Sequence, residues 1–381
     1  MTETLDAPLA LLGGMSPQGF MRRHWQRKPL LVRGGACDWV DRLPRAELFA
    51  LAGRDDVESR LVRQQEGRWR LDHGPFRRLP ARSQPGWTLL VQGVEAHVPA
   101  ARSLMDAFRF IPDARLDDVM VSWAADGGGV GPHFDAYDVF LVQVSGRRRW
   151  RIGRQRHLDL MEDVPLKILQ RFEPEQEWVL EPGDWLYLPP RWAHDGVAEA
   201  ADCITASVGF RAPSMLELAD QLLARLLDPE GDDPSDLRTR YRDPKQAATV
   251  TPALIPADLQ AFAQQALQRA VSDPQRVARA LGEWLSEPKA QQVFVPQEGE
   301  PLGGVSLAPA SRLLVDRWHV FFNGDAYRVS GRDARLLARL AHRRCLSAAD
   351  VAQLSPEARA LVMDALEWGW LWPLTTNTPM G

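Results

Sequence analysis

The fold is decided by the stretch GGGVGPHFDAYDVFLVQVSGRRRW, residues 127–150. From Tyr137 to Val144 apolar and β-branched residues dominate, and their side chains alternate between the two faces of an extended chain. Glycines and a proline precede this run, and a Ser-Gly pair follows it, as is typical of strand ends. We therefore predict a buried strand, with His133 and Asp135 two residues apart at its entrance and facing the same side.

A second histidine completes a candidate metal site. His194, in the segment PPRWAHDGVA, follows a predicted strand at Trp185–Leu188, and a barrel of short strands could bring it beside His133 and Asp135. Two imidazoles and one carboxylate on one side of a metal leave positions open for substrate and oxygen, as in non-heme iron(II) oxygenases. We therefore predict that these three side chains bind Fe(II).

A second His-x-Asp pattern occurs at His157-Leu158-Asp159. Because the chain contains 8 histidines, one such pattern has little meaning alone. His157 lies in an arginine-rich loop with no apolar strand after it, whereas Asp135 leads directly into one. We therefore assign the metal to His133 and Asp135. The alternative, that His133 and Asp135 are only a hydrogen-bonded core pair, is weaker in this context.

The arginine run after the strand holds a candidate cosubstrate contact. If Ser145-Gly146 is a two-residue hairpin turn, Gln143 pairs with Arg148, which then faces the interior with the metal ligands. A buried guanidinium is costly unless it meets an anion, and a carboxylate can accept two parallel hydrogen bonds from it. This favours 2-oxoglutarate, since its keto acid can chelate iron while its far carboxylate reaches Arg148. Three neighbours are expected to face outward: Arg147, Arg149 and Arg151.

Ser122 is a further candidate contact of the cosubstrate. It is the one hydroxyl among the small side chains on its face of a predicted strand at Val119–Ala125. It could donate a hydrogen bond to the carboxylate that Arg148 binds. An ordinary strand serine is the equal alternative.

Short β-type runs bounded by Gly and Pro fill residues 1–212. Many short antiparallel strands with tight turns indicate a mainly β, double-stranded β-helix domain of the jelly-roll or cupin type. An opening helix is expected at Pro17–Trp25. The expected strands are Pro29–Val32, Val57–Arg63, Trp69–Asp72, Trp87–Gly93, Val119–Ala125, Tyr137–Val144, Arg147–Ile152, Glu177–Leu180, Trp185–Leu188 and Cys203–Arg211.

The composition changes at Ser214, where a capping box with Glu217 opens a helix. Two more amphipathic helices follow, and residues 213–294 are expected to form a helical segment whose thin core leans on the β domain or on a second subunit. Residues 295–381 mix short strands with three small helices and resemble a winged helix. We favour a packing role for this α+β unit because no base-reading helix stands out, and direct nucleic-acid contact stays open.

The overall composition excludes several classes of protein. The 381 residues include 46 Lys and Arg against 50 Asp and Glu, a net charge of -4, which argues against a nucleic-acid coat or a membrane-surface protein. The 3 cysteines are far apart, so neither a disulfide framework nor a thiolate zinc site is predicted, and a cytoplasmic location is expected. The sequence has no apolar run long enough to cross a membrane.

In these residues the chain resembles the JmjC-type ribosomal oxygenases of the bacterial cupin family. The similarity covers FMRRHWQRKPLLVRG at 20–34, GGGVGPHFDAYDVFLVQVSGRRRWRIG at 127–153, EPGDWLYLPPRWAHDG at 181–196, and the order of a β domain, a helical segment and a winged-helix-like end. The family pattern places iron on His133, Asp135 and His194, and the carboxylate of 2-oxoglutarate on Arg148. The same resemblance implies that Ser122 is a further contact of the cosubstrate.

The resemblance implies an Fe(II)- and 2-oxoglutarate-dependent dioxygenase that uses O2. It would hydroxylate the β-carbon of an arginine in a large-subunit ribosomal protein and form a homodimer through the helical segment. Asp126 and Asp138 flank the His133 and Asp135 pair in sequence, and either could receive the substrate guanidinium or lie at a solvated surface. Two other functions stay open: a small-molecule hydroxylase of the same chemistry, and a non-catalytic cupin whose C-terminal domain binds nucleic acid.

Overall fold

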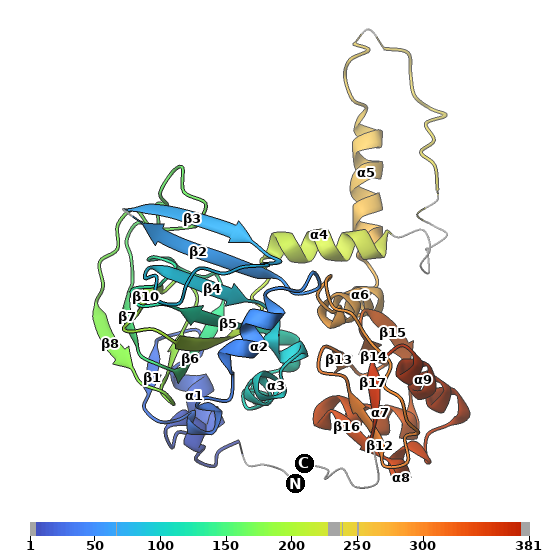
Figure 1. The fold of residues 1–381 in the computed structure, drawn as a ribbon. Coiled ribbons are helices and arrows are strands. Elements are labelled where there is room, and N and C mark those ends of the chain that lie inside the picture. Colours follow the sequence, from blue (N-terminus) through green and yellow to red (C-terminus); the bar gives the residue numbers. More distant parts are fainter. Residues whose placement is uncertain (1–4, 66, 228–236, 238, 250, 375–381) are drawn as a thin grey trace. The chain divides into compact units, whose positions relative to one another are not determined.

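The computed structural model describes residues 5–65, 67–227, 237, 239–249 and 251–374, which form two compact units (Figure 1). Unit 1 comprises Met1–Ala212, Lys289–Phe294 and Ala308–Ala310, and unit 2 comprises Pro213–Pro288, Val295–Leu307 and Ser311–Gly381. The helices after residue 212 thus group with the C-terminal part of the chain. A boundary between 213–294 and 295–381 remains a prediction.

Unit 1 is built from two antiparallel sheets, as the jelly-roll prediction requires. The larger sheet has 8 strands in the order β1-β9-β6-β11-β5-β4-β2-β3, and the smaller has the order β10-β7-β8. The strands are β1 Leu30–Val32, β2 Ser59–Gln65, β3 Arg68–His73, β4 Trp87–Val91, β5 Leu116–Ala124, β6 Asp138–Ser145, β7 Arg148–Gly153, β8 Gln176–Leu180, β9 Trp185–Leu188, β10 Ala193–Ala198 and β11 Cys203–Phe210. The α-helices are α1 Pro17–Arg23, α2 Arg45–Leu51 and α3 Pro99–Asp106.

The two faces of the larger sheet bury different kinds of side chain. On β5, Val121 and Trp123 join the main apolar core, to which α1, α2 and α3 also contribute. Ser122 lies between them in sequence and is also buried, so it faces the opposite side. That side holds a smaller apolar cluster with members from both sheets, among them Leu141 and Trp150. The space between the sheets is therefore only partly apolar, and polar side chains share it.

The predicted hairpin at Ser145-Gly146 is wrong. β6, which ends at Ser145, pairs with β9 and β11 in the larger sheet, whereas β7 pairs with β10 and β8 in the smaller one. Gln143 lies opposite Thr205, and Arg148 lies opposite Ala198 and Leu180. The Ser-Gly pair therefore begins a crossing between the two sheets. Each of the two strands thereby has a hydrogen-bonded neighbour on both of its edges.

Unit 2 begins with the predicted helix, and the capping box of Ser214 with Glu217 is present. Three helices, α4 Met215–Leu226, α5 Ala257–Ala270 and α6 Pro274–Ser286, precede a small α+β part. In α6, Gly282 lies so close to the Phe321 ring that a methyl group would overlap it. The remaining elements are β12 Gly304–Leu307, β13 Leu313–Val315, β14 His319–Phe322, β15 Asp325–Arg328, α7 Gly331–Arg343, β16 Cys345–Ser347, α8 Ala348–Val351, α9 Pro356–Glu367 and β17 Leu371–Leu374.

The C-terminal part of unit 2 has its own apolar core, which joins residues of α7 and α9 to the strands β12, β13, β14 and β17. Its strands form two sheets of 3 strands, β16-β12-β17 and β13-β14-β15. This is the mixed architecture expected from the sequence. Among the described residues of the whole chain, no helix is both long and apolar enough to span a membrane.

Candidate metal centre

The structure brings the three predicted metal ligands together. His133 lies ahead of β6 and forms an isolated antiparallel bridge with His194 at the start of β10, through backbone N–H···O=C bonds of 3.0 and 2.8 Å. The ring centroids of the two histidines are 4.2 Å apart, and Asp135 Oδ2 lies 3.7 Å from His194 Nε2. One ligand atom from each residue lies within 4.8 Å of the others, and in the described part of the chain no other such group of three was found.

Backbone carbonyls orient both imidazoles. The Nδ1 of His133 contacts the Gly131 carbonyl at 2.8 Å, and the Nδ1 of His194 contacts the Trp192 carbonyl at 2.9 Å. A carbonyl can only accept, so each Nδ1 carries the proton and each Nε2 has its lone pair free for a metal. Burial, and then the neighbouring His133, lower the pKa of His194 to about 4. The imidazole of His194 is therefore neutral at physiological pH, as a metal ligand must be.

Gly131 occupies a position that few other residues could fill. Its φ is +80°, and a methyl group on its α-carbon would come within 3.0 to 3.2 Å of Trp69 and Ile168. The glycine therefore allows the chain to turn closely against β3 just before His133, and its carbonyl orients the His133 ring.

Arg148 is buried as predicted, although the hairpin argument for it was wrong. Its exposed fraction is 3%, and its Nε and Nη2 atoms are buried without a hydrogen-bond partner among the described residues. On β7 the buried residues Arg148, Trp150 and Ile152 alternate with more exposed ones, and His194 lies opposite Ile152. Arg148 is thus four residues along β7 from Ile152, the residue opposite His194. Four residues of a strand span about 13 Å. An anion between Arg148 and His194 would satisfy the free guanidinium atoms.

Trp150 was not recognised in the sequence as a residue of this site. Its ring lies 5.8 Å from the His194 ring and 5.7 Å from the Arg148 guanidinium carbon. Its indole Nε1 is also buried without a partner among the described residues. A methyl group on Gly196, directly opposite on β10, would come within 2.6 Å of this ring. The small Gly196 therefore lets Trp150 form a wall of the space between the metal ligands and Arg148.

Ser122 faces this space but already has a protein partner. Its hydroxyl donates to the Thr205 carbonyl at 3.3 Å, and the Thr205 hydroxyl donates to Gln143 Oε1 at 2.9 Å. All three side chains are buried. A hydroxyl can donate only one hydrogen bond, so a contact with a bound carboxylate would require Ser122 to turn its proton away from Thr205. Its role towards a cosubstrate remains a prediction.

The other arginines of the run face outward as predicted. The side chains of Arg147, Arg149 and Arg151 are 53%, 49% and 42% exposed, and each forms an ion pair. Arg149 pairs with Glu199, and Arg151 pairs with Asp195 at 2.5 Å. The predicted alternation of inward and outward side chains from Arg147 to Arg151 is therefore confirmed, although the predicted pairing of this strand with β6 is wrong.

Two acidic candidates near the triad differ sharply. Asp138 is fully buried and accepts hydrogen bonds from the Tyr187 hydroxyl at 2.6 Å and from Gln26 Nε2 at 2.9 Å. Burial raises its pKa. The prediction that Asp138 lies at the mouth of the site or at a solvated surface is therefore wrong, because its carboxylate is a structural acceptor in the core. Asp126 is exposed and remains a candidate.

The second His-x-Asp pattern does not form a metal site with the first. His157 and Asp159 are both exposed, and neither belongs to the group of converging ligand atoms. The sequence did not predict β10, although this strand carries His194. Its residues AHDGVA show no alternation of polarity, because nearly all of them are buried whichever face they occupy. The pairing of β10 with β7 therefore had no local signal.

Comparisons with known proteins agree with this geometry. Residues 103–218 match the JmjC domain, and residues 266–372 match the ROXA-like winged helix. The chain is 37% identical over 288 residues to the ribosomal protein uL16 3-hydroxylase of Escherichia coli, covering 73% of this chain and 74% of the relative. It is 38% identical over 230 residues to a probable ribosomal oxygenase of Haemophilus influenzae, covering 58% and 55% of the two chains.

Solved structures are similar over nearly the whole chain. The X-ray structure of E. coli ycfD superposes with a TM-score of 0.83 at 31% identity, covering 92% of this chain and 96% of that one. A second structure, of the E. coli ribosomal oxygenase YcfD in complex with cobalt and 2-oxoglutarate, superposes with a TM-score of 0.78 at 32% identity and the same coverage.

Proposed function

The chain belongs to the JmjC-type ribosomal oxygenases, and on this basis we propose that it hydroxylates an arginine of the large-subunit ribosomal protein uL16 at the β-carbon, using Fe(II), 2-oxoglutarate and O2. The observation that carries the proposal is the presence, in unit 1, of a converged two-histidine, one-carboxylate site and a buried arginine whose Nε and Nη2 have no hydrogen-bond partner among the described residues. The similarity to the E. coli uL16 3-hydroxylase supports the choice of substrate.

His133, Asp135 and His194 would hold the iron. Their donor set fits Fe(II), because both Nε2 atoms are free and the Asp135 carboxylate lies beside them. When bound, the iron supplies the activation of O2 that is coupled to conversion of 2-oxoglutarate to succinate and CO2. The backbone carbonyls of Gly131 and Trp192 fix the two rings, so the ligands need little reorganisation when the metal enters.

Arg148 would bind the carboxylate of 2-oxoglutarate that lies farther from the metal. Its free Nε and Nη2 atoms can donate two parallel hydrogen bonds to a carboxylate, a geometry that a lysine could not match. Trp150 would wall the space between the two ends of the cosubstrate, and its free N–H is a further donor. Ser122 would add a hydrogen bond on the opposite sheet. Together these side chains exclude water from the cosubstrate and fix its direction.

The substrate proposal is tested by comparing molecules that differ in size. Free arginine, a peptide that contains the target arginine of uL16, and intact uL16 are each incubated with enzyme, Fe(II), 2-oxoglutarate and O2, and the hydroxylated product is measured. We expect product from the peptide and the protein, since contacts remote from the reacting carbon help to position it. Hydroxylation of free arginine at a comparable rate would instead establish a small-molecule hydroxylase.

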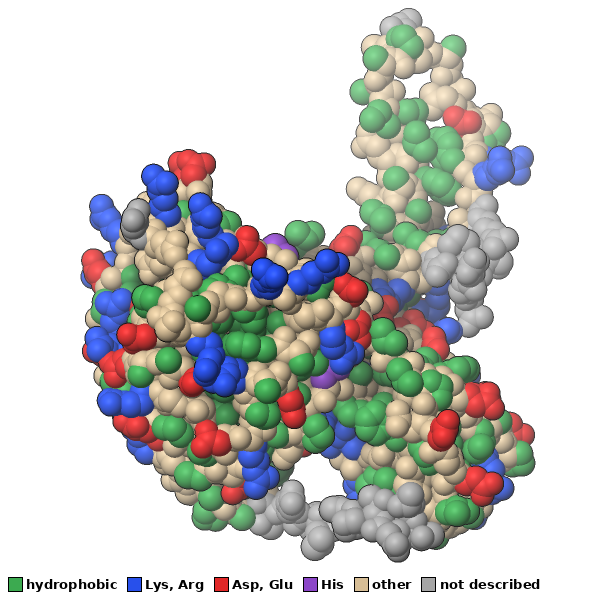
Figure 2. All heavy atoms as spheres, viewed as in Figure 1, with side chains coloured by type: hydrophobic (Ala, Val, Ile, Leu, Met, Phe, Trp, Pro, Cys, Tyr) green, Lys and Arg blue, Asp and Glu red, His purple; other side chains and the backbone are tan. Residues whose placement is uncertain are grey.

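We also propose that the chain is a homodimer formed through the helices of residues 213–294. Two adjacent residues at the start of α4, Met215 and Leu216, are 89% and 80% exposed, and Leu267 on α5 is 62% exposed. Figure 2 shows hydrophobic side chains gathered along α5. Apolar surface of this kind is usually covered by a partner. Leu216→Asp combined with Leu267→Asp should give monomers in sedimentation, and an unchanged sedimentation coefficient would exclude this interface.

A cytoplasmic location is proposed as well. All three cysteines, Cys37, Cys203 and Cys345, are free. Free thiols are the usual state in a reducing compartment, which is also where a ribosomal protein is available as a substrate. Fractionation of cells that produce the protein, followed by immunoblotting, would test this.

A further inference from the structure

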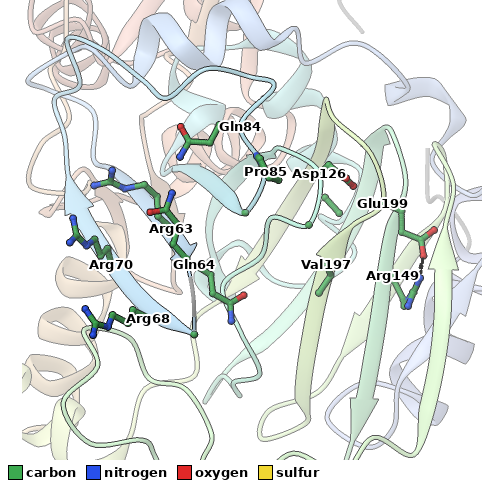
Figure 3. Close-up of a pocket in the computed structure, with 15 residues that line it drawn as sticks. Arg63, Gln64, Arg68, Arg70, Gln84, Pro85, Asp126, Arg149, Val197 and Glu199 are labelled. Atoms are coloured by element: carbon green, nitrogen blue, oxygen red, sulfur yellow. Dashed lines mark hydrogen bonds and ion pairs between the residues drawn. The ribbon is translucent and has the colours of Figure 1, made fainter.

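A basic groove lies on unit 1, and none of the metal ligands lines it. Its volume is about 1210 Å³, and its lining includes Arg63, Arg68 and Arg70 of the β2–β3 hairpin. Figure 3 shows these three side chains on the hairpin and the ion pair of Arg149 with Glu199 across the groove. In all, 4 arginines and 2 acidic residues line the groove, which gives it a net charge of +2.

The acidic residues of the groove are already engaged. Glu199 pairs with Arg149 and lies 3.5 Å from Arg147, and Asp126 Oδ1 accepts a hydrogen bond from the Ala200 N–H at 2.9 Å. The uncompensated charge therefore lies on the hairpin. There the side chains of Arg68 and Arg70 are exposed, and neither side chain has a hydrogen bond or ion pair with any residue that the structure describes.

The register of the hairpin places like charges side by side. Arg63 lies directly opposite Arg70, and Gln65 lies directly opposite Arg68. Like charges opposite each other destabilise a pair of strands. Of these arginines only Arg63 has its charge compensated, by an ion pair with Asp72 at 2.5 Å. Arg68 and Arg70 are two residues apart on one face, so their backbone positions are about 7 Å apart. This repeat is close to the separation of successive phosphates in an extended single strand of nucleic acid.

We propose that this groove binds the phosphate backbone of an RNA strand. Guanidinium groups bind phosphate in a bidentate manner, and the glutamines that line the groove, Gln64, Gln65 and Gln84, can donate further hydrogen bonds. The groove is much larger than one phosphate ion, and among the described residues no aromatic side chain lines it on which bases could stack, so its contacts follow the backbone. A basic peptide is disfavoured by the groove's own positive charge.

The test measures binding of a fluorescein-labelled oligouridine of about 20 nucleotides by fluorescence anisotropy over a range of salt concentrations. Arg68→Gln with Arg70→Gln removes two phosphate contacts, so the affinity should fall about tenfold and the slope of log K against log salt should become shallower by about 1.4. The matched control is Arg22→Gln with Arg42→Gln, which changes the net charge equally at two exposed arginines outside the groove. The control should bind as the parent protein does.

Three results would overturn the inference. These are no RNA binding by the parent protein, an equal loss of affinity in the control, or displacement of the labelled RNA by polyglutamate as effectively as by unlabelled RNA at the same concentration of negative charge. The last would make the occupant an acidic protein. Hydroxylation of a short uL16 peptide should be the same in all these proteins, because the groove contains no metal ligand. Failure of RNA binding is therefore distinguishable from failure of the proposed hydroxylase function.

Discussion

Arg148→Met separates the roles of this guanidinium in cosubstrate binding and in folding. Methionine keeps most of the apolar stem and removes the charged group, whose Nε and Nη2 have no partner among the described residues. Loss of a charge-assisted hydrogen bond costs about 1.5–3 kcal/mol, so the Kd for 2-oxoglutarate should rise about 10- to 150-fold. The ligand-free protein should become more stable by about 1 kcal/mol or more, because a buried group without a partner destabilises the fold.

Both quantities can be measured without turnover. The protein is loaded with Mn(II) under nitrogen, and the Kd for 2-oxoglutarate is obtained by isothermal titration calorimetry, while the free energy of unfolding without ligand is obtained from urea denaturation. Arg149→Met is the control, since Arg149 is the neighbouring residue on β7, is 49% exposed and pairs with Glu199. Its Kd for 2-oxoglutarate should match that of the parent protein.

The opposite signs of the two effects make the prediction easy to contradict. A purely structural Arg148 would lose stability and cosubstrate affinity together. An unchanged Kd in Arg148→Met, or an equal rise in Arg149→Met, would show that the carboxylate binds elsewhere.

The remaining predictions concern the metal, the wall of the cosubstrate site and a buried acid. His133→Ala should abolish stoichiometric binding of Mn(II) or Co(II) in calorimetry while His157→Ala keeps it, and the reverse result would exchange the two His-x-Asp patterns. Gly196→Ala should lower the free energy of unfolding in urea by about 1–3 kcal/mol, because the methyl group overlaps the Trp150 ring, and an unchanged value would refute this packing. Burial raises the pKa of Glu95 from 4.5 to about 7, so the folded state retains a proton that the unfolded chain has lost, and stability falls as the pH rises through this window. Glu95→Gln should therefore exceed the parent protein in unfolding free energy by about 3 kcal/mol above pH 8 and match it below pH 4, and an equal difference at both pH values would exclude the titration.

The sequence predicted those features of the site whose signal is local. Alternation of polarity along a strand identified the strand after Asp135. Arg148 was placed inside through a hairpin that does not exist, but its burial and the exposure of its neighbours are confirmed along β7. The two-residue spacing of His133 and Asp135 was likewise visible without any knowledge of the fold. The jelly-roll class followed from the number of short strands and turns.

Features that depend on distant partners were not predicted. The crossing from β6 to β7 was mistaken for a hairpin because the sequence of a turn does not say to which sheet the next strand belongs. β10 was missed since burial on both of its faces removes the alternation that marks a strand. The buried position of Asp138 depends on Tyr187 and Gln26, which come from two other parts of the chain. Long-range pairing, rather than local propensity, decided each of these.

The most direct test of the central claim is mass spectrometry of large-subunit ribosomal proteins after incubation with the enzyme, Fe(II), 2-oxoglutarate and O2. The predicted result is a gain of one oxygen atom on uL16 alone, located by fragmentation to the β-carbon of an arginine, and absent with Asp135→Ala. Succinate formation without any oxygen gain on a ribosomal protein, or a gain that persists in Asp135→Ala, would contradict the account.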